Sequence, residues 1–219
     1  MESWQDTAPS IPVMVTTRGL EAFLPERVDI WGVHVPMLDT PNNRPILQRT
    51  AQEDSVWWYV DHSPQRPYGN LLLDFRAIEH RILFWQTWAV GISGFHYWAV
   101  NYHAEGADPW ERQLDMTPVN GDGLLIYPSD NGPVSSIRLE TARDGIEDYD
   151  YLVMLSQRIR ALRDQGGHEA LLEEAEETRN LGGVMTSLVS FTRDGDVLRE
   201  QRRDIGRMIQ RLDDALEGG

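Results

Sequence analysis

Residues 121–152 read GDGLLIYPSDNGPVSSIRLETARDGIEDYDYL, and this stretch decides the fold. The short apolar run at residues 124–127 has the length of a strand, and the prolines, glycine and small polar residues that follow favour an irregular loop. Beyond Ser135 the apolar side chains recur at spacings of three and four residues, which places them on one face of a helix: Ile146, Tyr149, Leu152, Leu155, Ile159 and Leu162. The stretch therefore predicts a strand, a loop and a long amphipathic helix.

Further apolar runs lie on both sides of this stretch. Strands are expected at residues 11–17, 28–35, 55–60 and 95–100, a helix at about residues 70–90, and a polar segment with helical potential at residues 46–53. Apolar strands separated by helical or connecting segments indicate a parallel sheet built from βα units. Both faces of such a sheet are covered, so its strands need not alternate. Downstream, helices are expected at residues 168–181 and, with Asp194 or Asp196 as the N-cap, up to about Leu216.

Several of these segments resemble the C-terminal part of the catalytic domain of glycoside hydrolase family 123, a region also catalogued as the DUF4091 domain. The resemblance is carried by Gly-Asp-Gly at 121–123, Tyr-Pro at 127–128, Ser-Ile-Arg-Leu-Glu at 136–140, Arg-Asp-Gly-Ile-Glu-Asp-Tyr at 143–149, Arg81-x-x-x-Trp85-Gln86-x-Trp88 and Gly94-Phe95-x-Tyr97-Trp98. It implies that the βα units are the last four of a (β/α)8 barrel. The expected fold is α/β: the C-terminal half of a TIM-type barrel at residues 1–164, followed by a helical appendage at residues 165–219.

Composition restricts the partners. A formal net charge of −15 over 219 residues argues against nucleic acid and against an anionic membrane surface. The most apolar tract, residues 88–100, is too short to span a bilayer, and the first residues do not read as a signal peptide. The absence of cysteine excludes disulfides, thiol catalysis and cysteine-ligated metals. The sequence thus predicts a soluble globular protein without a cofactor, in a compartment that it does not specify.

Candidate site residues lie where the expected strands end, because barrel enzymes place their sites at the carboxyl ends of strands. Aromatic rings can stack on the C–H face of a sugar, and Asn, Asp and His can hydrogen-bond its hydroxyls. Both types occur at these positions: Trp31, His34, Tyr59, Asp61, Trp98, Asn101, Tyr102 and, in the loop before the long helix, Tyr127. We therefore expect a carbohydrate as the ligand, although each aromatic side chain could instead serve the core.

A metal site is a weaker alternative. His34, Asp61, His62 and His103 could supply ligands, but their spacing matches no compact ligand motif. The charged residues at 140–148 are interpreted as structural, with Arg138 and Arg143 expected to pair with carboxylates and fix the helix to the barrel. No metal is predicted.

The resemblance also implies chemistry. Family 123 acts on β-N-acetylgalactosaminides by a substrate-assisted retaining mechanism, with an adjacent Asp-Glu pair at a strand end. The acidic neighbours Glu53-Asp54 and Glu147-Asp148 do not follow an expected strand, so the pair is expected upstream of Met1 and no catalytic residue is assigned. Two hypotheses remain. The chain is either the C-terminal portion of a glycoside hydrolase, inactive alone, or a non-catalytic half-barrel module for carbohydrate binding or assembly. In both, the open sheet edges predict a homo-oligomer or association with the missing N-terminal half.

Overall fold

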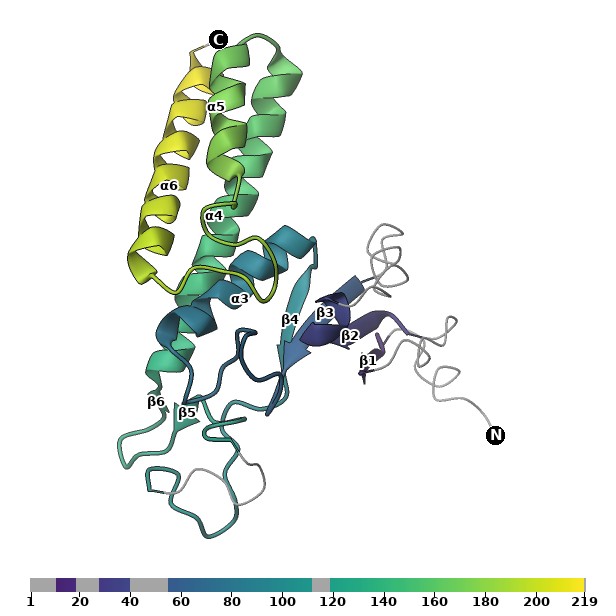
Figure 1. Cartoon of the computed structure of the whole chain (residues 1–219), viewed down its shortest axis with the longest axis vertical. Coiled ribbons are helices and arrows are strands. Elements are labelled where there is room, and N and C mark those ends of the chain that lie inside the picture. The colour runs from purple at the N-terminus through teal and green to yellow at the C-terminus, as the bar shows by residue number, and fades with distance from the viewer. Residues whose placement is uncertain (1–10, 19–27, 40–54, 112–118, 219) are drawn as a thin grey trace.

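A parallel four-stranded sheet forms the first part of the structure. The computed structural model describes residues 11–18, 28–39, 55–111 and 119–218 (Figure 1). The strands are β1 (Met14–Thr17), β2 (Ile30–His34), β3 (Ser55–Val60) and β4 (Gly94–Tyr97), and they lie side by side in sequence order. All three pairings are parallel. The prediction of a parallel sheet is confirmed, and a sheet in this order with helices against it is the arrangement found in part of an α/β barrel. The segment expected to be helical at residues 46–53 lies outside the described residues.

The register of the sheet assigns its side chains to two faces. Thr16 pairs with Gly32, Gly32 with Trp57, and Trp57 with Gly94, so these residues share one face, which we call the inner face. The opposite face packs against helix α3 (Ala77–Val90), where Trp58 donates its indole N–H to Thr87 Oγ1 at 2.9 Å. An apolar cluster between sheet and helices buries the side chains on this opposite face, including Trp31, Val33 and Trp58, together with Phe84 of α3. A short 3-10 helix, η2 (Val35–Asp39), follows β2.

Helix α3 begins seven residues later than the sequence predicts. Leu71 and Leu72 are buried and fit a helical spacing, but residues 70–76 are turns and irregular structure. Asn70 explains the difference, because its side-chain amide donates to the carbonyls of Asp61 at 3.0 Å and Pro64 at 2.9 Å. An asparagine that binds nearby backbone in this way stabilises a non-helical conformation.

The stretch at residues 121–152 contains the predicted strand, loop and helix, but the strand is limited to residues 126–127 and a second short strand closes the loop. Strand β5 (Ile126–Tyr127) pairs antiparallel with β6 (Val134–Ser135), and helix α4 (Ile137–Gln165) begins where Ser136 accepts a hydrogen bond from the backbone N–H of Leu139. The predicted apolar face needs one correction. Ile146 is 49% exposed, whereas Asp148 is buried. Asp148 can be buried because Arg81 and Trp85 of α3 both donate to its carboxylate, at 2.5–2.8 Å.

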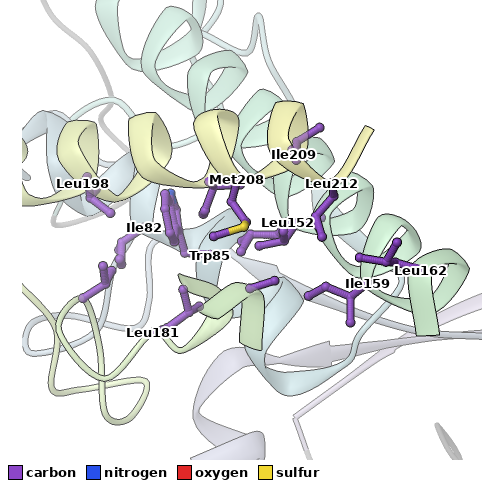
Figure 2. Close-up of a cluster of buried hydrophobic side chains, with 14 of the residues drawn as sticks. Ile82, Trp85, Leu152, Ile159, Leu162, Leu181, Leu198, Met208, Ile209 and Leu212 are labelled. Carbon is purple, nitrogen blue, oxygen red and sulfur yellow. The ribbon is translucent and has the colours of Figure 1, made fainter. Parts of the chain in front are cut away.

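The C-terminal helices α5 (Glu169–Arg179) and α6 (Gly195–Glu217) pack against α4 to form a bundle that extends away from the sheet (Figure 1). Asp194, one of the two expected N-caps, accepts a hydrogen bond from the backbone N–H of Asp196. Apolar side chains from α3, α4, α5 and α6 converge in one buried group, which we call the helical cluster (Figure 2). The second half of α4 therefore belongs to the same apolar group as the tail. None of the helices in the described residues combines the length and apolar character that a membrane span requires.

Candidate functional site

A polar group connects the carboxyl ends of β1, β2 and β3. Arg18 follows β1, His34 ends β2, and Asp61 follows β3. Asp61 Oδ1 accepts hydrogen bonds from the backbone N–H of Ser63 at 2.9 Å and from its hydroxyl at 3.0 Å, while Oδ2 pairs with Arg18. Ser63 Oγ also lies 3.0 Å from Arg18 Nη1 and 3.1 Å from His34 Nε2. We call these four residues the Asp61 cluster.

Hydrogen bonding and burial together determine the charges of Asp61 and His34 in the Asp61 cluster. Burial alone would raise the pKa of Asp61, but hydrogen bonds from Ser63 and Arg18 outweigh this effect and hold that pKa below its ordinary value. Burial lowers the pKa of His34, against the opposing effect of Ser63. At neutral pH Asp61 is therefore a carboxylate and His34 a neutral imidazole. Because Ser63 gives its one hydroxyl proton to Asp61, His34 Nε2 donates to Ser63.

The side chain of Tyr59 lies on the inner face of the sheet, next to His34 of this cluster. The register aligns it with His34 on one side and His96 on the other. Its ring centroid is 5.2 Å from that of His34 and 6.5 Å from that of His96, and the residue is only 8% exposed. Burial raises the pKa of the Tyr59 hydroxyl, which stays protonated at neutral pH. The residues that the sequence predicts at the ends of β2 and β3 are thus brought together, except for Trp31.

Trp31 lies on the other face of the sheet. It is 1% exposed and packs in the apolar cluster between the sheet and the helices. Successive side chains of a strand point to opposite faces, so Trp31 and His34 cannot both face inward. A continuously apolar run gives no signal of which residues face which side, and this is why the sequence places both in one site. We leave Trp31 out of the proposed site.

A second group forms around Trp98, directly after β4. The Trp98 indole N–H donates to Asp122 Oδ1 at 3.0 Å, and the Tyr97 hydroxyl donates to the same oxygen at 3.1 Å. The centroids of the Trp98 and Tyr102 rings are 4.9 Å apart. Trp98 nevertheless stays 44% exposed, whereas Asp122 is 1% exposed. A buried carboxylate therefore fixes the plane of an exposed indole. We call Tyr97, Trp98, Tyr102 and Asp122 the Trp98 cluster.

The Gly-Asp-Gly turn presents Asp122 to Trp98. Gly121 and Gly123 have φ angles of +76° and +73°, a conformation that glycine adopts without strain. A Cβ atom on Gly123 would come within 2.5 Å of the Trp98 ring. The backbone N–H of Gly123 also donates to the Tyr97 hydroxyl at 2.9 Å. The turn and the aromatic pair consequently form one unit.

Arg138 fixes the position of this turn through hydrogen bonds. Its buried guanidinium donates to the carbonyls of Leu71 at 2.8 Å and Gly121 at 2.6 Å, to the carbonyl of Leu124, and to the Tyr127 hydroxyl at 3.2 Å. The expectation that Arg138 pairs with carboxylates is wrong, because its partners are backbone and hydroxyl oxygens. Arg143 pairs with Glu140 and Glu147 of its own helix. Helix α4 is instead fixed to α3 through the Arg81–Asp148 ion pair.

A hollow of about 330 Å³ opens where the loops after β4 meet β5, and its wall includes Asn101 and Tyr127. Tyr127 is 7% exposed and its ring centroid lies 4.7 Å from that of Trp110. His103 also lines the hollow, whereas His62 lies beside Asp61, with 3.5 Å between its Nδ1 and Oδ1. The four candidate metal ligands are thus divided between two places, with His34, Asp61 and His62 at one and His103 at the other. Within the described residues, no group of three His, Asp or Glu side chains could hold a metal ion.

Sequence reasoning missed several residues of these groups. Arg18 directly follows an expected strand, which was a usable signal. Asp122 lies in the Gly-Asp-Gly turn, but the sequence does not indicate that it accepts a hydrogen bond from Trp98. Ser63 and Trp110 lie in loops, where position alone does not indicate a contact.

Comparisons with known proteins place the chain in a family. The model of the glycoside hydrolase 123 catalytic domain matches residues 4–155, well over half of the chain. The chain therefore belongs to the glycoside hydrolase 123 family. Among solved structures, a family 123 glycoside hydrolase from Clostridium perfringens, studied for the hydrolysis of glycolipid glycans, is similar in fold, with a TM-score of 0.57 and 13% identity. The match covers 94% of this chain and 36% of that chain, so this chain spans about a third of its length. No curated protein matches significantly.

Proposed function

We propose that this chain is the C-terminal portion of a glycoside hydrolase that acts on β-N-acetylgalactosaminides by a substrate-assisted retaining mechanism. On this proposal residues 1–164 form half of the barrel and residues 165–219 a helical appendage, and the catalytic Asp-Glu pair lies in the upstream half. The proposed sugar-lining residues are His34, Tyr59, Asp61, Trp98, Asn101, Tyr102 and Tyr127. Family membership supports the class of reaction.

One observation carries the sugar-binding role: the exposed indole of Trp98 is held in place by the buried carboxylate of Asp122. Free rotation of an exposed side chain must be lost on binding, and a ring that is already fixed avoids much of that cost. A flat apolar face next to hydroxyl and amide groups suits a pyranose, which has C–H groups on its faces and hydroxyls at its edge. Tyr102 and Asn101 supply such groups within four residues of Trp98.

The charge of Asp61 supports a catalytic acid elsewhere. Glycoside hydrolysis requires a carboxylic acid that protonates the leaving-group oxygen, and such acids have raised pKa values. Hydrogen bonds lower the pKa of Asp61, so it is ionised at neutral pH and holds no proton to donate. Its suitable role is to accept hydrogen bonds. The same observation is compatible with the alternative, a non-catalytic half-barrel module that binds carbohydrate or takes part in assembly.

Hydrolysis of an aryl β-N-acetylgalactosaminide distinguishes these functions. The 219-residue chain alone should show no turnover, because the missing acid typically contributes about 10²–10⁴-fold in rate. A polypeptide extended upstream to include the rest of the barrel should be active. If that longer protein binds the sugar but does not cleave it, the alternative holds. Turnover by the 219-residue chain at the rate of a full-length homologue would contradict the proposal, and Asp61→Asn would then be the first variant to test.

We also propose that the sheet associates through its edges, either with the upstream half of the barrel or with a second copy of the chain. Strands β1 and β4 each have one sheet neighbour within the described residues. The open edge of a parallel sheet exposes backbone N–H and C=O groups that can pair with another strand. Light scattering should therefore detect an oligomer of the isolated chain, and a stable monomer at all concentrations would contradict the half-barrel.

A further inference from the structure

The carboxylate of Glu79, in the first turn of α3, is almost completely buried, with 1% of the residue exposed. It accepts hydrogen bonds from Arg66 Nε at 3.2 Å and Nη2 at 3.0 Å, and from the backbone N–H of Arg76 at 2.8 Å. It also pairs with Arg193, whose Nη1 lies 2.6 Å from Glu79 Oε1. Burial alone would raise the pKa of Glu79, but the hydrogen bonds from Arg66 and Arg76 and the nearby positive charges hold that pKa below its ordinary value. The carboxylate is therefore ionised and has two cationic partners.

Arg193 belongs to the segment between α5 and α6, far in sequence from the loop after β3 that it contacts. Its second amino group, Nη2, donates to the carbonyl of Pro67 in that loop at 2.9 Å. The central carbon of its guanidinium lies 3.7 Å from the centroid of the Phe191 ring, which restricts the directions that the side chain can take. Gln86 of α3 fixes the same segment by donating to the carbonyl of Leu188 at 3.1 Å, where the segment passes α3 (Figure 1). The tail therefore contacts the loop through a side chain that is itself held in place.

The loop that Arg193 contacts carries two members of the Asp61 cluster. Asp61 and Ser63 lie at its start, and Pro67 follows Ser63 by four residues. The side chain of Asn70 fixes this start through its hydrogen bonds to the backbone. Arg193 acts on the part of the loop beyond those contacts, so the tail and the loop's own asparagine hold it at two different points.

A single arginine with two hydrogen bonds can compensate the charge of a carboxylate, and Arg66 already gives Glu79 two. The second arginine therefore supplies a connection to the tail, in addition to its charge. We propose that Arg193 is a positioning residue, through which the helical appendage holds the loop after β3 and keeps Asp61 and Ser63 in place for the sugar. This inference rests on the proposed function, because it takes the Asp61 cluster as part of the sugar site.

Amide hydrogen exchange of the 219-residue chain tests the positioning without a ligand. The backbone N–H of Ser63, which donates within the Asp61 cluster, reports on the loop. The backbone N–H of Leu152, a buried residue of the helical cluster, reports on global unfolding. Arg193→Ala should raise the exchange rate at Ser63 by roughly 10- to 150-fold, the range for losing a hydrogen bond to a charged group, with much less change at Leu152. Arg66 still pairs with Glu79 in this variant, so the chain should fold.

Two further variants serve as controls. Arg158→Ala breaks the ion pair between Arg158 and Asp213 in the helical bundle, and the side chain of Arg158 is 34% exposed, close to the 33% of Arg193. This variant should leave the exchange at Ser63 unchanged. Arg193→Lys should keep part of the protection, because it retains the charge but not the planar group that contacts both partners. An equal rise at Ser63 and Leu152 in Arg193→Ala, or the same rise at Ser63 in Arg158→Ala, would overturn the inference, since Arg193 would then serve only the stability of the fold.

Calorimetric titration with N-acetylgalactosamine connects the loop to the ligand, in a polypeptide extended upstream to include the rest of the barrel. The Kd of Arg193→Ala should rise roughly 2- to 10-fold, because only molecules with the loop in place bind the sugar. Arg158→Ala should leave the Kd unaltered. An unchanged Kd in Arg193→Ala would overturn the positioning role. If the unaltered polypeptide binds no N-acetylgalactosamine while the exchange at Ser63 still rises in Arg193→Ala, the proposed function fails and the connection between tail and loop stands.

Discussion

The helical cluster and the loops at the strand ends are built by opposite rules. In the helical cluster, large apolar side chains from four helices are almost fully buried (Figure 2). The buried carboxylate of Asp148, which Trp85 of this cluster contacts, forms ion pairs with Arg81 and Arg202. At the strand ends the carboxylate of Asp61 is partly buried and that of Asp122 is buried, and the Trp98 indole that Asp122 binds stays 44% exposed. Stability should therefore depend mainly on the first region, and ligand binding on the second.

Two tryptophans provide the largest test of this comparison. Trp85 is fully buried and donates to Asp148 at 2.7 Å. Trp85→Ala should lower the free energy of unfolding by about 3–5 kcal/mol, the range for truncating a buried aromatic side chain. Trp98→Ala, the matched control at an exposed position, should cost much less. Denaturant unfolding of both variants measures the difference, and equal losses would show that the two regions do not differ as described.

The pH dependence of stability provides the next test. His80 on α3 is 3% exposed, and burial lowers its pKa to about 4. Its Nε2–H donates to the carbonyl of Leu72 at 3.2 Å, and this hydrogen bond favours the protonated ring, but the effect of burial outweighs it. Because the folded pKa lies below the unfolded value, the stabilisation is complete above about pH 6.5 and is lost as the pH falls toward 4. The loss should be roughly 3 kcal/mol.

The variant His80→Gln keeps a side-chain donor and removes the titrating ring. Its unfolding free energy should change less between pH 6.5 and pH 4 than that of the unaltered chain. His34 also has a lowered pKa and acts in the same direction, so some pH dependence should remain. Met154→Ala, at an exposed position on α4 with no titrating group, is the control and should leave the profile unaltered. Identical profiles for His80→Gln and the unaltered chain would show that His80 does not titrate as described.

A smaller loss of stability is expected from substitution of Asp122, a residue that should contribute both to stability and to sugar binding. Asp122→Ala leaves the indole N–H of Trp98 and the hydroxyl of Tyr97 without their common acceptor. An unsatisfied buried donor costs about 1–3 kcal/mol, so stability should fall by that order, and sugar affinity should fall as well because Trp98 is no longer fixed. Asp122→Asn retains an acceptor oxygen and should lose less of both. An unchanged sugar affinity in Asp122→Ala would contradict the positioning role.

The sequence predicted the elements better than their contacts. Strand β3 (Ser55–Val60) has the limits that the sequence predicts, because the apolar run is followed by the polar residue Asp61 and then by a turn. The start of α3 was missed because Leu71 and Leu72 continue the helical spacing. The side chain of Asn70 instead donates to the backbone carbonyls of Asp61 and Pro64, which stabilises a non-helical conformation. The burial of Asp148 in place of Ile146 depends on Arg81, which is 67 residues away. Periodicity carries no information about a partner so distant in sequence.

The candidate site follows the same pattern. Tyr59, Asp61 and His34 could be predicted together because the carboxyl ends of parallel strands lie at one edge of a sheet. Trp31 could not be separated from them, because an apolar run does not reveal the direction of its side chains. The pairing of Trp98 with Asp122 joins residues 24 apart through a turn whose geometry depends on positive φ angles. Such a contact becomes visible only in the folded chain.

The binding of N-acetylgalactosamine to a polypeptide extended upstream to include the rest of the barrel, with and without Trp98→Ala, measured by calorimetry alongside denaturant unfolding, tests the central claim most directly. An indole that acts as a stacking platform should contribute about 1–3 kcal/mol to binding, by analogy with aromatic–base stacking. Trp98→Ala should therefore weaken binding by that amount while the chain unfolds far less readily than Trp85→Ala. If Trp98→Ala unfolds as readily as Trp85→Ala and leaves sugar binding intact, Trp98 belongs to the core and the proposed sugar site is wrong.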